Sequence, residues 1–322
     1  MSNKRVNSDL LSTLILMIKV RMVEEAIANS YHLGKMRCPT HLSIGQEAVP
    51  SVLSSFLNEK DLAVSTHRGH AHYIAKGGSI PEMLAEIYGK ATGCSNGKGG
   101  SMHLIDKSIG FMGTSAIVGN SIPIGVGLAM GLKLMASDRI AVIYLGDGAT
   151  EEGVFYESLN FAVVRELPVL FVCENNLYSV YSSLACRQPR EREIYRVARS
   201  MGLDAVKLDG NNPISLADEI EPLINKVRTT SRPIFIECDT YRLREHCGPN
   251  FDDDLNYRNE SELKAWKVRD PINCLVSHLG LTQNDVMKIK EGITFEINEA
   301  FDFADKSSFP AMSEAYTGEF AV

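Results

Sequence analysis

Apolar strands alternate with helical segments through the middle of the chain, and this alternation constrains the fold more than any other feature. The strands are expected at residues 140–145, 169–173, 205–208 and 233–239, with helices at 151–166 and 215–227. The first strand is almost wholly apolar, as expected for a parallel strand covered on both faces. Strands that alternate with helices form parallel sheets with right-handed crossovers. We therefore predict an α/β fold, with an open, mostly parallel sheet and helices on both faces.

The rest of the chain is expected to extend this α/β domain at both termini rather than to form a second domain. No internal repeat, low-complexity tract or Pro/Gly/Ser-rich linker interrupts the 322 residues. We predict a single domain over residues 1–322, with an N-terminal helical extension at about 8–34 and a C-terminal helical tail at about 259–322. Glycine is dense between residues 89 and 127, where strand and helix signals are few, so we expect a long functional loop there.

Composition excludes several classes of function. The net charge of -7 gives no indication of a positively charged surface, which argues against a nucleic-acid partner. The seven cysteines are odd in number, scattered and without CxxC pairs, which argues against a disulfide framework or a zinc site and favours a reducing compartment. No apolar run approaches the roughly 20 residues that span a bilayer. We expect a cytoplasmic protein with neither a nucleic-acid nor a membrane partner.

Two polar side chains follow neighbouring strands of the predicted sheet. Asp147 follows the first apolar strand, and Asn176 comes 29 positions later, after the next strand. Ligands bind outside the carboxyl ends of parallel strands, so both side chains are expected in one crevice. A carboxylate and an amide oxygen suit magnesium, which fills its octahedron with phosphate oxygens and water. Gly146 and Gly148 let a phosphate approach the backbone, and the helix that begins near Glu151 points its free N–H groups there.

These residues belong to a longer stretch with a known counterpart. Residues 146–178, GDGATEEGVFYESLNFAVVRELPVLFVCENNLY, resemble the thiamine diphosphate motif, in which GDG is followed one strand–helix–strand unit later by NN. Further motifs follow in the family's order: HLSIGQEA (41–48), STHRGHAHYIAKG (65–77), GKGGSMHL (97–104), IVGNSIPIGVG (117–127) and a YR–H–YR–W–DPI pattern (241–272). Over residues 10–280 the chain resembles the alpha subunits of the pyruvate, acetoin and branched-chain 2-oxo acid dehydrogenase complexes.

The resemblance implies a thiamine-diphosphate-binding fold, with thiamine diphosphate and Mg²⁺ as cofactors. It implies that Asp147, Asn176 and the main-chain carbonyl of Tyr178 bind the metal. The residues implied in cofactor binding are His67, Arg68, Ala116, Val118, Asp147, Gly148, Ala149, Asn176, Tyr178 and His246. His41, which would face the substrate carboxylate, and His246 are the implied catalytic residues. Arginine is a permanently charged donor suited to phosphate, and histidine can change its charge near neutral pH.

The resemblance also implies partners. A glutamate has to protonate the aminopyrimidine ring of the cofactor, and in this family it comes from the beta subunit. We therefore expect a beta subunit that supplies the pyrimidine-side half-site, an alpha2-beta2 heterotetramer, and inactivity of this chain alone. With its partner the chain would decarboxylate a 2-oxo acid, or cleave acetoin, and transfer the acyl unit to the lipoyl group of an acyltransferase.

Two departures from the family's pattern bear on substrate and control. His67 stands where a tyrosine is usual, and Cys247 replaces the serine that a kinase modifies in mitochondrial members, so that mode of control is not supported. The loop at 246–254 carries Asp252, Asp253 and Asp254, which would discourage anionic substrates, alter docking of a lipoyl domain, or form a solvated surface run.

Two alternatives accompany this hypothesis. The first is a thiamine-diphosphate-dependent carboligase or decarboxylase of a biosynthetic pathway, built on the same two-chain core but without a lipoyl acceptor. The second is a magnesium- and nucleotide-binding switch on a similar sheet, which is disfavoured because the chain contains no GxxxxGK[ST] loop.

Overall fold

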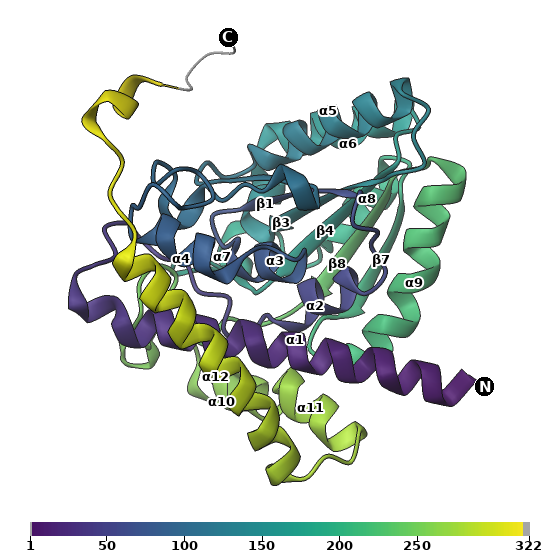
Figure 1. Ribbon diagram of the computed structural model, residues 1–322. Coiled ribbons are helices and arrows are strands. Elements are labelled where there is room, and N and C mark those ends of the chain that lie inside the picture. Colours follow the sequence, from purple (N-terminus) through teal and green to yellow (C-terminus); the bar gives the residue numbers. More distant parts are fainter. Residues whose placement is uncertain (1, 318–322) are drawn as a thin grey trace.

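One parallel sheet with helices on both faces organises the chain (Figure 1). The structure is a computed structural model that describes residues 2–317. The strand order is β2-β1-β3-β4-β8-β7, and every neighbouring pair is parallel. The strands are β1 (Leu62–Thr66), β2 (Phe111–Ser115), β3 (Ala141–Gly146), β4 (Val169–Asn175), β7 (Asp204–Asp209) and β8 (Ile234–Asp239). The α/β class and the open parallel sheet expected from the sequence are confirmed.

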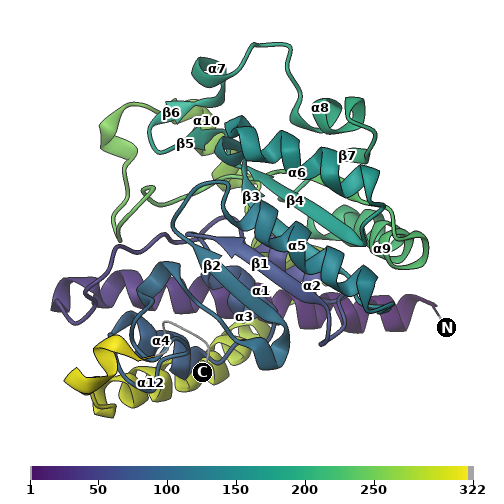
Figure 2. The same cartoon turned by 90° about the horizontal axis from the view of Figure 1, so that it is seen from above.

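Different helices cover the two faces, because side chains alternate along each strand. Ile143 and Leu145 of β3 pack in one cluster with α5 (Ser121–Leu134), α6 (Gly153–Val164) and α8 (Ile194–Ser200). Val142 and Tyr144 of the same strand pack in the other cluster, with α1 (Ser2–Ser30), α2 (Ala48–Ser54), α3 (His70–Ala75) and α9 (Pro213–Thr230). Figure 2 looks down on α5 and α6 lying across one face of the sheet.

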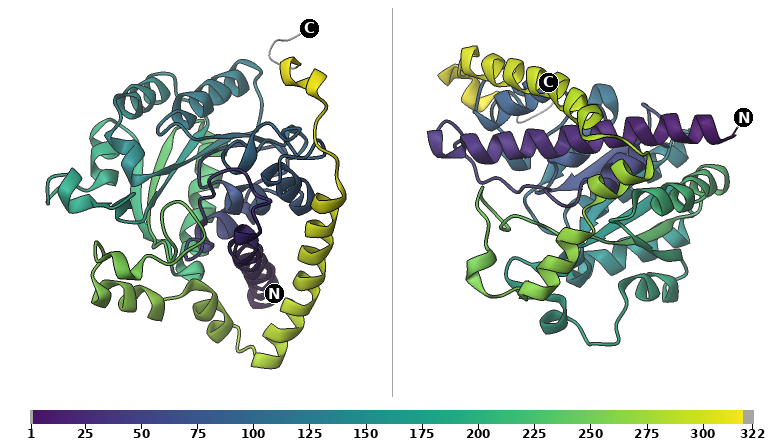
Figure 3. Two further views of the ribbon diagram at one scale, coloured as in Figure 1. Left: turned by 90° about the vertical axis from the view of Figure 1, so that its left-hand side faces the viewer. Right: turned by 90° about the horizontal axis from the view of Figure 1, so that it is seen from below.

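The two ends of the chain share the second of these clusters. Leu14 and Met17 of α1 are fully buried there, and α12 (Gln283–Lys306) adds Ile293 and Ile297. Figure 3 shows α1 running beneath the sheet with α12 beside it. Helix α4 (Ile80–Ile87) packs against α12, while α10 (Glu260–Val268) and α11 (Pro271–His278) lead from the sheet to it. Within residues 2–317, no helix combines the length and the apolar character needed to cross a bilayer.

The expectation of a long loop between residues 89 and 127 is wrong in part. Strand β2 and the first half of α5 lie inside that stretch. One glycine of α5 is required for its packing: a Cβ on Gly125 would collide with the side chain of Ile143, so glycine at this position lets the helix approach the sheet closely. Tertiary packing overrides the poor helix propensity of this segment.

Candidate functional site

A cleft opens at the carboxyl ends of β1, β3 and β4, where parallel sheets bind ligands. It is lined by Gln46, Thr66, His67, Arg68, Ile117, Val118, Gly119, Gly146, Asp147, Gly148, Ala149, Glu174, Asn176, Tyr178, Ser179, Val180 and His246. The structure thus brings together most of the residues that the sequence singled out. Two of them are not in this lining: His41, whose ring lies against the rings of His67 and His246, and Ala116, which precedes the lining residue Ile117.

Asp147 and Asn176 meet because β3 and β4 are adjacent and in register at their ends. Asp147 is only 2% exposed, at the start of a 3-10 turn (Asp147–Glu151) that precedes α6. Burial raises the pKa of the Asp147 carboxyl, while Arg187 and the backbone N–H groups of Asp147 and Asn176 oppose the rise. The carboxylate therefore lies against the backbone of Asn176, as the strand spacing predicts.

The turn after Asn176 brings main-chain groups to the cleft. The side-chain Oδ1 of Asn176 accepts a hydrogen bond from the backbone N–H of Tyr178 at 3.2 Å. Between them Leu177 has a φ of 71°, and Val180 has a φ of 53°, which is rare for a β-branched residue. The Tyr178 hydroxyl donates to Glu262 at 2.8 Å. The Tyr178 side chain is thus tied to α10.

Arg68 is a buried cation without an acidic partner. It is 6% exposed and donates to the carbonyl oxygens of Leu42 at 2.6 Å and of His246 at 3.2 Å. In the described part of the chain no carboxylate forms an ion pair with it, although Arg228 and Arg242 each have one. Burial, and next the charge of Arg242, lower the pKa of Arg68 to about 9. A desolvated guanidinium at the wall of a cleft is a receptor for an anion.

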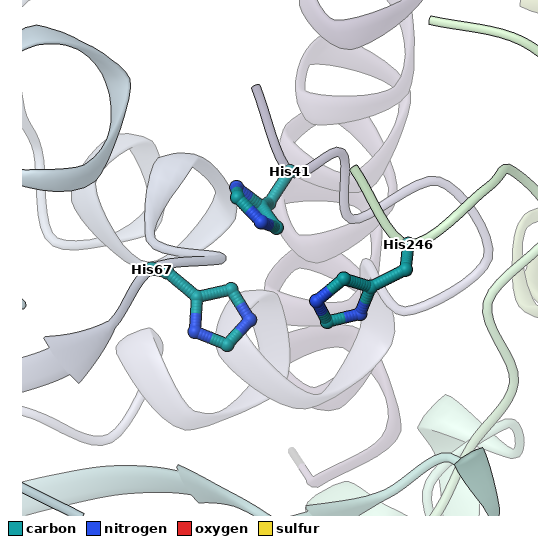
Figure 4. A group of neighbouring side chains, drawn as sticks. All are labelled: His41, His67 and His246. Atoms are coloured by element: carbon teal, nitrogen blue, oxygen red, sulfur yellow. The ribbon is translucent and has the colours of Figure 1, made fainter. Parts of the chain in front are cut away.

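Three histidines converge at the cleft (Figure 4), and one of them, His246, contacts Arg68. The ring centroids of His41 and His67 lie 4.6 Å apart, and that of His246 lies 5.1 Å and 5.4 Å from them. Burial, followed by the charge of Arg68, lowers the pKa of His41 to about 2, of His67 to about 4 and of His246 to about 3. All three imidazoles are therefore neutral at physiological pH, and Nδ1 of His41 has no hydrogen-bond partner.

The residues of the cleft fit a magnesium ion with a diphosphate. Asp147 and Asn176 supply the hard oxygen ligands that magnesium prefers. Arg68 lacks an anion, as described above. A Cβ on Gly148 would lie 2.9 Å from Oγ of Ser179, so a residue without a side chain is what lets this turn lie so close to Ser179. The donor set, the unpaired cation and the bare turn together match a metal-bound diphosphate.

The sequence did not point to several residues of the cleft. Gln46 accepts a hydrogen bond from Nδ2 of Asn176 at 3.4 Å, and Glu174 is buried with Oε1 unpartnered and Oε2 3.2 Å from Nε2 of His72. Gln46 stands in HLSIGQEA and Glu174 stands in the stretch 146–178, both quoted above. Their place in these stretches was the sequence signal that could have identified them as residues of the cleft. Arg187 pairs with both Asp147 and Glu151, and nothing in the sequence marks it.

The acidic loop is not a run of three solvated charges. Asp252 is 2% exposed and pairs with Arg242 at 3.3 Å and with Arg258, and the Tyr257 hydroxyl donates to it. Asp253 pairs with Lys267 at 3.2 Å. Of the three aspartates, Asp254 is exposed and forms no ion pair with any described residue. Asp252 therefore anchors the loop that carries His246.

Comparison with known proteins identifies the family. The model of the family described as "Dehydrogenase E1 component" matches residues 15–313. The chain belongs to this family. It is 36% identical over 305 residues to the pyruvate dehydrogenase E1 component subunit alpha of Rickettsia bellii (strain RML369-C), covering 94% of this chain and 92% of that protein. It is 34% identical over 309 residues to the subunit of the same name from Porphyra purpurea, covering 92% and 89%.

A chloroplastic relative agrees. The pyruvate dehydrogenase E1 component subunit alpha-3 of Oryza sativa subsp. japonica is 34% identical over 318 residues, covering 95% of this chain and 74% of that protein. The expected function is confirmed: the chain is the alpha subunit of a thiamine-diphosphate- and Mg²⁺-dependent, decarboxylating 2-oxo acid dehydrogenase.

Proposed function

We propose that this alpha subunit acts on pyruvate or a 2-oxo acid of similar size, in a complex that transfers the acyl unit to the lipoyl group of an acyltransferase. The observation that carries the proposal is the similarity to pyruvate dehydrogenase alpha subunits over 94% of the chain, which includes every residue of the cleft. No observation favours a carboligase or decarboxylase without a lipoyl acceptor.

The metal half of the site is assigned to residues at the ends of β3 and β4. Asp147, Asn176 and the main-chain carbonyl of Tyr178 would hold Mg²⁺, because magnesium prefers hard oxygen ligands of these kinds. Backbone N–H groups of Gly148 and Ala149 bind the diphosphate at the turn that precedes α6. The proximity of Asp147 to the Asn176 backbone and the bare Gly148 support this assignment.

The other half of the site binds anions. Arg68 and His67 bind the diphosphate, and backbone groups of Ala116 and Val118 contact the aminopyrimidine ring. When bound, thiamine diphosphate supplies the electron sink for decarboxylation. His41 orients the substrate carboxylate, and His246 donates a hydrogen bond to the reacting centre as charge develops there. Their depressed pKa values support these roles, because neutral imidazoles keep both a donor and an acceptor nitrogen.

We further propose a beta subunit, in an alpha2-beta2 heterotetramer, that supplies the pyrimidine-side half-site and its glutamate. Ile117 is 68% exposed and Val118 is 49% exposed, although both line the cleft. Ile124 of α5 is also exposed, at 46%. Apolar side chains around the entrance of a polar cleft are typical of a surface that a second chain covers.

The single-domain organisation over residues 1–322, with extensions at about 8–34 and 259–322, remains part of the proposal. The shared hydrophobic cluster of α1, α12 and the sheet supports it. A reducing compartment, here the cytoplasm, is supported by seven cysteines that are all free.

The test is to assay the purified chain alone and after co-expression with a beta subunit. 2-Oxo acid-dependent reduction of an artificial electron acceptor should require both chains, Mg²⁺ and thiamine diphosphate, with pyruvate preferred over branched-chain 2-oxo acids. Turnover by the chain alone would refute the two-chain site. Preference for a branched-chain acid would refute the assigned substrate and leave the site intact.

A further inference from the structure

Arg187 occupies the place where a metal would approach Asp147. It ends α7 (Leu184–Arg187), which follows the short hairpin of β5 (Tyr178–Ser179) and β6 (Ser182–Ser183). Its guanidinium pairs with the carboxylates of both Asp147 and Glu151. Its Nη1 also lies 3.8 Å from the point that a Cβ on Gly148 would occupy. The side chain is 11% exposed, so the pair with Asp147 is largely shielded from water.

This contact has consequences for metal binding. The Arg187 side chain pairs with Oδ2 of Asp147, so a divalent cation that binds the same carboxylate meets a positive charge at close range. Because Asp147 is buried, leaving it without any cation would be costly. A metal ion that arrives alone must therefore displace Arg187 from the carboxylate or bind against the repulsion of its charge.

We propose that Arg187 is a resident counter-ion of the magnesium site, which excludes a free divalent cation and yields to one that arrives with a diphosphate. The inference rests on the proposed role of Asp147 as a metal ligand. A diphosphate at Gly148 offers Arg187 a new anionic partner within its reach, so the guanidinium exchanges one anion for another as the metal takes Asp147. Arg187 would therefore release Asp147 to a metal ion only when a diphosphate enters the cleft together with the metal.

The segment that carries Arg187 is able to make this exchange. Strand β6 has two residues and α7 has four, and none of these is buried, whereas Tyr178 of the two-residue β5 is buried and holds the start of the segment in place. Among the described residues, Arg187 donates, apart from its two ion pairs, only to the carbonyl of Ser182, at 3.2 Å, within the same segment. Movement of Arg187 therefore breaks no contact of the hydrophobic core.

The test measures Mn²⁺ binding to the full-length chain without thiamine diphosphate, by the electron paramagnetic resonance signal of free Mn²⁺. Arg187→Gln should bind Mn²⁺ at least about tenfold more tightly than the wild type, the factor that one charge-assisted hydrogen bond corresponds to. Arg187→Lys, which keeps the charge, should stay close to the wild type. Arg196→Gln is the matched control, because Arg196 is 67% exposed and pairs only locally with Glu193.

Asp147→Asn separates this inference from the proposal on which it rests. If Asp147→Asn abolishes Mn²⁺ binding and Arg187→Gln leaves the affinity unchanged, Asp147 keeps its role and the counter-ion role of Arg187 is refuted. If Mn²⁺ binding survives Asp147→Asn, the metal role of Asp147 and the inference both fail. Tighter binding in Arg187→Gln that disappears in the double variant supports both.

Discussion

Arg68 offers the sharpest test of whether the cleft is built for an anion. Its pKa falls from 12.5 to about 9, so its surroundings oppose the charged form by about 5 kcal/mol. The hydrogen bonds to the carbonyls of Leu42 and His246 offset part of this cost, each by about 1–2 kcal/mol. In the cofactor-free chain, Arg68→Met should therefore raise the free energy of unfolding by about 1–3 kcal/mol.

The same change should damage cofactor binding. An anion on Arg68 receives charge-assisted hydrogen bonds that methionine cannot make, so the affinity for thiamine diphosphate with Mg²⁺ should fall at least about a hundredfold. The first quantity is measured by urea denaturation in the presence of a chelator, and the second by calorimetry on the two-chain complex. The stability difference is fully present below pH 9 and should shrink as the pH rises above 9, where folded Arg68 loses its proton first.

Arg228→Met is the control with the opposite sign. Arg228 donates to both carboxylate oxygens of Asp61, at 2.9 and 2.6 Å, and Asp61 is fully buried. Its removal leaves a buried carboxylate unpaired and should destabilise the chain by about 3 kcal/mol. If Arg68→Met destabilised the chain in the same way, or left cofactor affinity unchanged, Arg68 would be a structural residue and the anion argument would be wrong.

Three further predictions concern single side chains of the cleft. Asp147→Asn should abolish or greatly weaken binding of thiamine diphosphate with Mg²⁺ in calorimetry, with nearly unchanged folding by circular dichroism. His246→Ala in the assembled complex should lower turnover with an artificial acceptor at least about a hundredfold while size-exclusion chromatography still shows the complex; near-normal turnover would make it a loop residue only. His67 has a pKa of about 4 in the folded chain against 6.5 when unfolded, so the folded state loses stability as the pH falls below 6.5, by about 2 kcal/mol at pH 5. His67→Gln should remove this part of the loss of stability in acid, as measured by urea denaturation at several pH values. A pH profile equal to that of the wild type would contradict the prediction.

The parts of the fold that the sequence predicts well are those set by local composition. Strands β3, β4 and β8 are mostly apolar runs, and their boundaries differ from the expected ones by only one or two residues. Helix α5 was not predicted because glycine weakens the helix signal, and the reason for Gly125 is its contact with Ile143, a residue distant in sequence that local patterns do not reveal. Helix α6 begins two residues after the expected start because a 3-10 turn carries the Asp147 backbone into the cleft first.

The same division holds for the site. Asp147 and Asn176 could be paired from the sequence, because the topology of a parallel sheet alone brings adjacent strand ends together. The ion-pair partner of Asp147 could not be predicted from the sequence. Arg187 reaches Asp147 from a segment of very short elements, β5, β6 and α7, whose path no periodicity in the sequence determines. Asp252 is a similar case, because its burial depends on Arg242 and Arg258, and a row of three acids carries no sign of which one is paired.

The cleft holds two buried charges of opposite sign that do not neutralise each other. Within the part of the chain that the structure describes, Arg68 is bonded only to carbonyl oxygens and an imidazole, while Asp147 is paired with Arg187. A cleft selected for stability alone would pair these two charges, because each pays a desolvation penalty while apart. A metal-bound diphosphate carries a cation that complements Asp147 and phosphate oxygens that complement Arg68, so it compensates both buried charges at once. Cofactor binding should therefore stabilise the folded chain more than Mg²⁺ and diphosphate analogues do separately, since neither ion alone compensates both sites.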